Sequence, residues 1–422
     1  MDMTIHLDNM SEINYRIFFH LSLWIFIFIC NLAMAKDYNL KVGLGGSIVG
    51  QKYSILEKDT TSLTSEPKIL ADGDYSILLG SHKLEGQFSS DVGNKSLWGN
   101  FRLQWRYDIS QFTTEISEVV EGRLPYTDYH DVVGYFKHRF NLYLQQKLNT
   151  GKISTRLWVE GKNYENTGEF YYNYDLLRSK VEYDFRLFQG NVALLWTYSF
   201  RSVPDSAQAN YDRRELQFSF SKLWKNANFT DFIIAYDRKN FPSEDRRGSY
   251  SSYYLYSNFS FPISNIFLNS QMDIENRNYD TEDEIYFDYF WLEFIPSIEN
   301  EFGLWQAEIG PRYAIQYADE QFIGGTYNEI GLKFSLSNLD YGKFWLFLDI
   351  TPGKRFYSFA TAQDTSILYS DYMFVDISAM TSIWFTSSIR GDLSIIYSPE
   401  WHNRPSDDIQ TSYFSFHIRY EF

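Results

Sequence analysis

Arginine side chains recur at regular spacing in several segments in which polar and apolar residues alternate. In the segment 95–108, Arg102 and Arg106 alternate with Leu103 and Trp105. A guanidinium stays positively charged at physiological pH and matches the geometry of carboxylates and phosphates. A row of such groups can therefore guide or bind anions, or form ion pairs with neighbouring acids.

The same alternation continues through 131–147, 152–164 and 170–187. Because successive side chains of a strand point to opposite faces, the polar residues of each segment share one face. The candidate pore-lining residues on this face are Arg102, Arg106, Arg139, Arg156, Arg178 and Arg186. Two interpretations remain open. The arginines form a basic wall that selects anions in a pore, or they form cross-strand ion pairs that fill a polar interior.

The end of the chain shows the strictest alternation. Phe414, Phe416, Ile418, Tyr420 and Phe422 alternate with polar residues, which places them on one face of a strand. In water such an edge strand would promote aggregation. The segment resembles the C-terminal strand of Gram-negative outer-membrane β-barrel proteins, which ends in Phe with an aromatic residue two positions earlier. The resemblance implies that these five residues are an assembly signal for the barrel-assembly machinery, and that the protein lies in the cell outer membrane.

The start of the chain predicts a cleaved signal peptide. An apolar run over 17–30 follows Arg16, and Ala33-Met34-Ala35 provides a small-residue cleavage site. We therefore expect a signal peptide over 1–35 and a mature outer-membrane β-barrel over 36–422. The single cysteine of the chain would leave with the signal peptide, so we expect no disulfide and no thiol chemistry in the mature protein.

Composition favours a barrel that crosses the membrane. Aromatic residues make up 19% of the chain, yet the mean hydropathy is −0.36. After residue 35 no apolar run approaches the roughly 20 residues that a transmembrane helix needs. Alternating lipid-facing and lumen-facing residues explain this combination, although a large soluble β-sandwich or β-propeller also alternates. The net charge of −16 argues against nucleic acid as a partner.

The alternation predicts an all-β fold, a transmembrane antiparallel β-barrel of 18 strands, with 16 as the alternative. The expected strands are 38–49, 74–88, 95–108, 131–147, 152–164, 170–187, 191–203, 211–224, 228–238, 249–261, 265–276, 284–297, 303–317, 326–337, 343–357, 368–380, 383–397 and 410–422. We expect short turns near residues 150, 190, 264 and 381. Longer polar links lie between the other strands, and only 50–73 and 109–130 are long enough to fold inward as a constriction.

An enzyme is the weaker interpretation. Of the five histidines after residue 35, only His417 has a potential nucleophile on the same strand face, Ser415. Two residues along a strand separate their Cα atoms by about 7 Å, and the pair lies at the very end of the closing strand. We therefore expect no catalytic residues, no metal site and no cofactor.

The resulting functional expectation is a porin-like channel for passive diffusion of small hydrophilic solutes, with a lean toward anions. One alternative is the outer-membrane barrel component of an export or surface-assembly system, and another is a barrel lipase or protease. The expected partners are outer-membrane lipid and lipopolysaccharide, the barrel-assembly machinery and the solutes. The choice between a monomer and a homo-oligomer is open at this stage.

Overall fold

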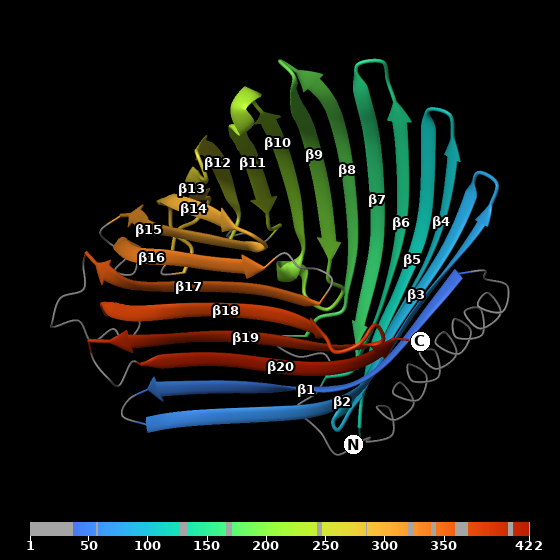
Figure 1. The fold of residues 1–422 in the computed structure, drawn as a ribbon, viewed down its shortest axis with the longest axis horizontal. Helices are drawn as coiled ribbons and strands as arrows, with labels where there is room; N and C mark the ends of the chain where they lie inside the picture. The colour runs from blue at the N-terminus through green and yellow to red at the C-terminus, as the bar shows by residue number, and fades with distance from the viewer. Residues whose placement is uncertain are drawn as a thin grey trace.

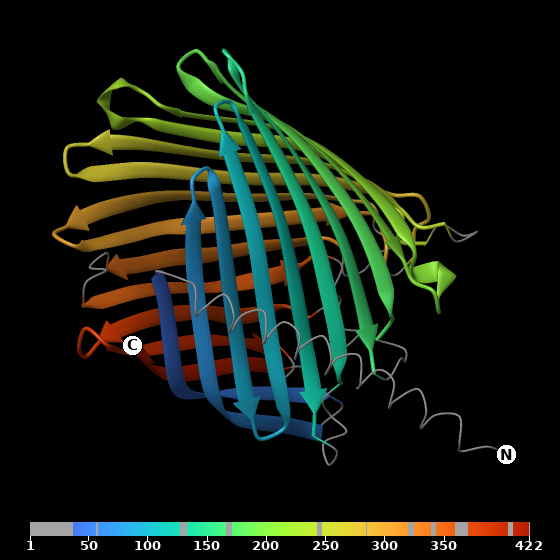
Figure 2. The same cartoon turned by 90° about the vertical axis from the view of Figure 1, so that its right-hand side faces the viewer.

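The strands of the chain form one closed antiparallel barrel of 20 strands (Figures 1 and 2). The computed structural model describes residues 37–55, 58–126, 133–165, 171–242, 247–283, 285–319, 325–338, 343–358, 370–403 and 408–421. Each strand pairs with the strands before and after it along the chain, and the last strand pairs with the first. The expected signal peptide and Phe422 lie outside the described residues.

The barrel consists of the following strands in chain order: β1 (Asp37–Ile55), β2 (Lys58–Leu79), β3 (His82–Gly93), β4 (Ser96–Ile109), β5 (Phe112–Pro125), β6 (Tyr135–Lys147), β7 (Gly151–Tyr164), β8 (Tyr174–Leu187), β9 (Gly190–Ser202), β10 (Tyr211–Leu223), β11 (Phe229–Asn240), β12 (Tyr250–Ile263), β13 (Ile266–Tyr279), β14 (Tyr289–Phe302), β15 (Trp305–Ala318), β16 (Tyr327–Asn338), β17 (Phe344–Tyr357), β18 (Tyr372–Trp384), β19 (Ile389–His402) and β20 (Ile409–Glu421). The two helices of the described residues, η1 (Ala207–Ala209) and η2 (Lys225–Ala227), are single 3₁₀ turns. Within that part of the chain no helix is long and apolar enough to span a membrane.

The C-terminal strand closes the barrel, as its sequence pattern predicts. β20 pairs with β19 on one side and with β1 on the other. Phe414, Phe416, Ile418 and Tyr420 share one face and are 39–46% exposed. Apolar side chains with this exposure on one face of a closed barrel form the surface that contacts lipid.

The strand count differs from the expected 18 because two segments that we expected to be links are strands. The segment 50–73 forms the end of β1 and most of β2, and 109–130 contains β5. The described parts of both segments belong to the barrel wall and form no inward constriction. The expected strand 74–88 is instead a hairpin, since Gly80 adopts a φ of +62° in the turn between β2 and β3.

The physical reason for both errors is that pairing overrides a weak local pattern. The lipid-side positions of β5 include Thr114, Glu118 and Gly122, which interrupt its apolar alternation. β2 contains Pro67 and few aromatic residues, yet all 19 residues of β1 pair with it. A strand flanked by two partners gains backbone hydrogen bonds along its whole length, whatever its own propensity.

The links divide the barrel into two ends. One end, here called the turn end, carries short links such as 80–81, 110–111, 188–189 and 264–265. The opposite end, the loop end, carries most of the longer links, such as 126–134, 203–210 and 358–371, although 56–57 and 94–95 are short. Barrels of this class have short periplasmic turns and longer external loops. The expected turn near residue 381 is wrong, because β18 continues to Trp384 and the turn follows at 385–388.

A close backbone approach at Gly310 generates a stability prediction. A Cβ at this position would lie 2.1 Å from the carbonyl oxygen of Pro296 and 2.7 Å from the Cα of Ser297. Backbone atoms of a neighbouring strand cannot move aside as a flexible side chain can. We expect Gly310→Ala to lower the free energy of unfolding by about 1–3 kcal/mol, measured as urea unfolding of the refolded barrel by tryptophan fluorescence.

Gly391→Ala is the matched control for this measurement. The nearest atom to a Cβ at Gly391 belongs to the ring of Phe385, at 3.0 Å, and a ring edge can shift. Equal unfolding midpoints for the two variants would contradict the proposed backbone contact.

Candidate functional site

The strand register assigns every polar row of the barrel to one of its two faces. In β4, Arg102, Gln104 and Arg106 share a face, and their partners in β5 are Val119, Ser117 and Glu115. The opposite face carries exposed apolar side chains along the whole circumference. Charge on the lipid face costs about 2–4 kcal/mol at the bilayer midplane. The row that contains the arginines is therefore the inner face, which lines the lumen.

The six arginines predicted from the sequence all lie on this inner face, on β4, β6, β7 and β8. Two of them have carboxylate partners. Arg106 donates from Nε to Asp108 at 2.7 Å, and Arg139 donates from Nε to the buried carboxylate of Glu160 at 2.6 Å. Lys137 also lies 3.5 Å from Glu160. Arg139 and Glu160 form the expected kind of cross-strand pair between β6 and β7, whereas Arg106 and Asp108 pair along the same strand.

The other four arginines have no ion pair within the described residues. Arg102 donates to Gln104 at 2.5 Å, and Arg178 donates to Ser199 at 3.0 Å. The guanidinium carbon of Arg156 lies 4.9 Å from the ring centre of Tyr143, and Arg186 lines a cavity of about 970 Å³ at the turn end. Neutral partners leave the positive charge uncompensated, so these side chains are available to an anion in the lumen.

Counted over the inner face, β4 to β10 carry about twice as many cations as carboxylates. The cations are Arg102, Arg106, Arg123, Lys137, Arg139, Lys147, Lys152, Arg156, Lys162, Arg178, Lys180, Arg186, Arg201 and Arg213. The carboxylates are Asp108, Glu115, Glu121, Glu160, Glu182, Asp184 and Glu215. We call this side of the lumen the basic wall.

The ratio is reversed over β11 to β19, which we call the acidic wall. Its carboxylates are Asp231, Asp237, Asp273, Glu275, Glu293, Glu299, Glu301, Glu308, Glu329, Asp349, Asp376, Asp392 and Glu400. Its cations are Lys239, Arg277, Arg312, Lys333, Arg355 and Arg390. In a ring of 20 strands, β7 and β17 are ten strands apart, so the two walls face each other across the lumen (Figure 1).

The alternation of the sequence indicated the basic wall and a mixed set of charges on the later strands, including Glu308, Glu329 and Asp349, but the excess of acids there emerges only when the inner face is counted over the whole register. The acids were visible at alternate positions, for example Glu299 and Glu301 in β14. Their inward orientation follows only from the register with Glu308 and Gln306 of β15. Several acids are held by neighbours: Glu329 accepts hydrogen bonds from Arg312 and Arg355. Others accept only from serine hydroxyls.

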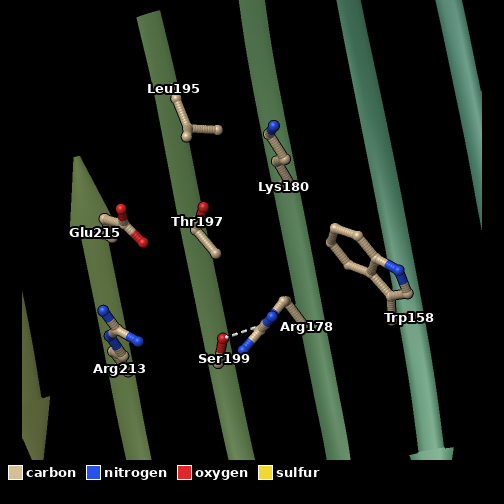
Figure 3. A pocket seen from close by; sticks show the side chains of 8 residues that line it. All are labelled: Trp158, Arg178, Lys180, Leu195, Thr197, Ser199, Arg213 and Glu215. Carbon is tan, nitrogen blue, oxygen red and sulfur yellow. Dashed lines mark hydrogen bonds between the residues drawn. The ribbon is translucent and has the colours of Figure 1, made fainter. Parts of the chain in front are cut away.

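A small pocket on the basic wall gathers three cations (Figure 3). It encloses about 190 Å³ and is lined by Arg178, Lys180 and Arg213 together with Ser199 and Trp158. Lys180 pairs with Glu182 at 2.8 Å and Arg213 with Asp237 at 2.8 Å. Of the three cations only Arg178 lacks an ion pair, and Glu215 supplies the one carboxylate of the lining.

The one pair considered for catalysis is not arranged as a catalytic site. Ser415 and His417 share the inner face of β20 but form no hydrogen bond with each other. The register partner of His417 is Asp392, which accepts hydrogen bonds from Ser382 and Arg390. A hydroxyl nucleophile needs a base within hydrogen-bond reach, and this geometry does not provide it.

No family model matches the chain, and no curated protein matches it. Solved structures do share its fold. The siderophore receptor PirA of Pseudomonas aeruginosa aligns at 10% identity with a TM-score of 0.53, over 91% of this chain and 80% of the receptor. The alcaligin outer-membrane receptor FauA of Bordetella pertussis aligns at 10% identity and 0.52, over 91% and 76%. OpdQ of Pseudomonas aeruginosa aligns at 10% identity and 0.50, over 92% and 98%.

These likenesses agree with the closed barrel, the exposed apolar outer face and the polar inner face. The chain therefore has the fold of Gram-negative outer-membrane β-barrel proteins, a closed barrel whose strands cross the membrane many times.

Proposed function

We propose that the protein is a channel for passive diffusion of small hydrophilic solutes, with a preference for anions. The observation that carries this proposal is the basic wall with its four arginines that lack carboxylate partners. A second observation that supports the proposal is that the described part of the chain leaves the interior of the barrel largely free. Almost all described residues belong to the barrel wall, and the links that are described in full, such as 203–210, are too short to fill the lumen of a barrel of 20 strands.

The facing walls act on a solute in two ways. Fixed charges of one sign on each side create an electric field across the lumen, and low-dielectric walls concentrate it. A dipolar solute is oriented by this field, whereas an anion is drawn along the basic wall. Arg102, Arg156, Arg178 and Arg186 lie on three strands between the two ends of the barrel, so their charges extend along the route of the anion.

The first test removes two unpaired charges from the basic wall. We expect Arg156→Ala/Arg178→Ala to shift the reversal potential of single channels under a salt gradient toward lower anion preference, because the local excess of positive charge falls. The measurement is planar-bilayer recording of the refolded protein. Unchanged ion selectivity in the double variant would refute the assignment of these arginines.

Arg214→Ala/Lys354→Ala is the matched control, because it removes the same formal charge from the outer face. The side chain of Arg214 is 64% exposed beside Asp212, and Lys354 lies over the ring of Phe356. This variant should keep the selectivity of the natural protein. A folded barrel without conductance would overturn the channel proposal and favour a gated export component or a barrel enzyme.

The second test acts on the acidic wall and should have the opposite sign. Asp349 and Asp376 accept hydrogen bonds from Ser335 and Ser398 and have no ion pair in the described residues. Asp349→Asn/Asp376→Asn removes two negative charges while retaining side-chain size and one acceptor oxygen at each position. We expect anion preference to rise in the same recordings. A shift toward cations would contradict the two-wall description of the lumen.

A further inference from the structure

A repeated residue pair marks the loop end of the lumen. Seven strands begin at that end with a tyrosine on the inner face, and the register partner of each tyrosine on the preceding strand is a cation in all cases but one. The tyrosines are Tyr135, Tyr174, Tyr211, Tyr250, Tyr289, Tyr327 and Tyr372. Their partners are Arg123, Lys162, Arg201, Lys239, Arg277, Gln316 and Arg355. We call this set the tyrosine–cation ring.

The rings and cations are in direct contact. Lys162 Nζ lies 4.0 Å from the ring centre of Tyr135, and the guanidinium carbon of Arg201 lies 4.5 Å from that of Tyr174. Lys239 Nζ lies 4.4 Å from Tyr211. A cation within about 6 Å of an aromatic ring is attracted by the negative face of the ring. Each of these contacts joins a cation to the tyrosine on the strand before it, and Arg277 and Arg355 repeat the arrangement over Tyr250 and Tyr327.

Hydrogen bonds one step deeper in the lumen fix the tyrosines. The hydroxyl of Tyr135 donates to Glu121 at 2.5 Å, and that of Tyr174 donates to Glu160 at 2.9 Å. The hydroxyl of Tyr250 donates to Asp237, also at 2.9 Å. Fixed aromatic rings in turn restrict the cations above them. Little side-chain freedom then remains to be lost when a ligand binds.

Charge compensation divides the ring into two parts. Arg277 pairs with Glu275 at 2.6 Å and Arg355 with Glu329 at 2.7 Å, on the acidic wall. By contrast, Arg123, Lys162, Arg201 and Lys239 have no carboxylate partner in the described part of the chain; we call these four the cationic arc. The Nε atoms of Arg123 and Arg201 are buried without any hydrogen-bond partner.

The spacing of the arc defines what it can bind. Its members lie on β5, β7, β9 and β11, every second strand, and strands are about 4.8 Å apart. Successive cations are therefore separated by roughly 10 Å at the backbone. A small anion contacts one of them, whereas an extended chain of negative charges contacts several at once and gains from multivalency.

We propose that the cationic arc is a binding site for extended multivalent anions that enter the lumen from the loop end. The arc is the loop-end part of the basic wall, extended by Lys239 of β11. The proposal rests on the proposed channel and specifies the class of anion that the channel takes. The tyrosines hold the cations in place, and the missing carboxylates leave their charge to the ligand.

The experiment uses linear polyphosphate as the probe in single-channel recordings of the full barrel. Orthophosphate is the comparison, because a single phosphate can contact only one cation of the arc. We expect polyphosphate to block the current at lower concentration from the loop end than from the turn end, and orthophosphate to block weakly. Lys162→Gln/Arg201→Gln should raise the blocking concentration on the order of tenfold, as the loss of two charged contacts implies. A cysteine introduced in the link after β9, Ala207→Cys, reports orientation through an impermeant thiol reagent.

Two comparisons keep the test decisive. Arg214→Gln on the outer face should leave the block unchanged, and Arg156→Ala/Arg178→Ala should change ion selectivity while retaining the preference for the loop end. Equal block from both ends, or an arc variant that blocks like the natural protein, would overturn the proposal. If the folded barrel does not conduct, calorimetric titration of polyphosphate into it, with and without the arc substitutions, decides the binding site independently of the channel.

Discussion

Every feature of this protein depends on the backbone hydrogen bonds that a strand must make in lipid. The hydrocarbon core offers no water to an unpaired N–H or C=O group, so a sheet can cross it only when no edge is left open. The pairing of β20 with β1 removes the last edge. The apolar row of β20 is thus exposed to lipid rather than to another chain.

Closure also determines the position of each charge. Because side chains alternate strictly along a strand, the register in which two strands pair assigns every residue of the hairpin to the lipid face or the lumen face. Charged residues that would be costly on the outer face accumulate inside. There they divide into groups that neutralise each other, such as Arg139 with Glu160, and groups that do not, such as Arg178 beside Ser199.

The uncompensated charges are not distributed evenly. The uncompensated cations described above lie on β4 to β11 at two depths, four arginines along the basic wall and the cationic arc at the loop end, whereas Asp349 and Asp376 lie unpaired on the acidic wall. The arc is built from a unit that recurs between β5 and β18, a tyrosine opposite a cation on the preceding strand. Repetition along these strands turns one local contact into a row at the loop end, and acids of the acidic wall neutralise the cations at one end of the row.

The sequence by itself determined the class of fold, the inner position of the six arginines and the apolar outer row of β20. The alternation of polar and apolar residues can be recognised within a single strand, without knowledge of its neighbours. It did not determine the strand count, since β2 and β5 have weak patterns and are held by their neighbours. It also could not place Tyr135 opposite Arg123, or the acidic wall opposite the basic one. Those arrangements join residues from different strands, and only register and closure bring them together.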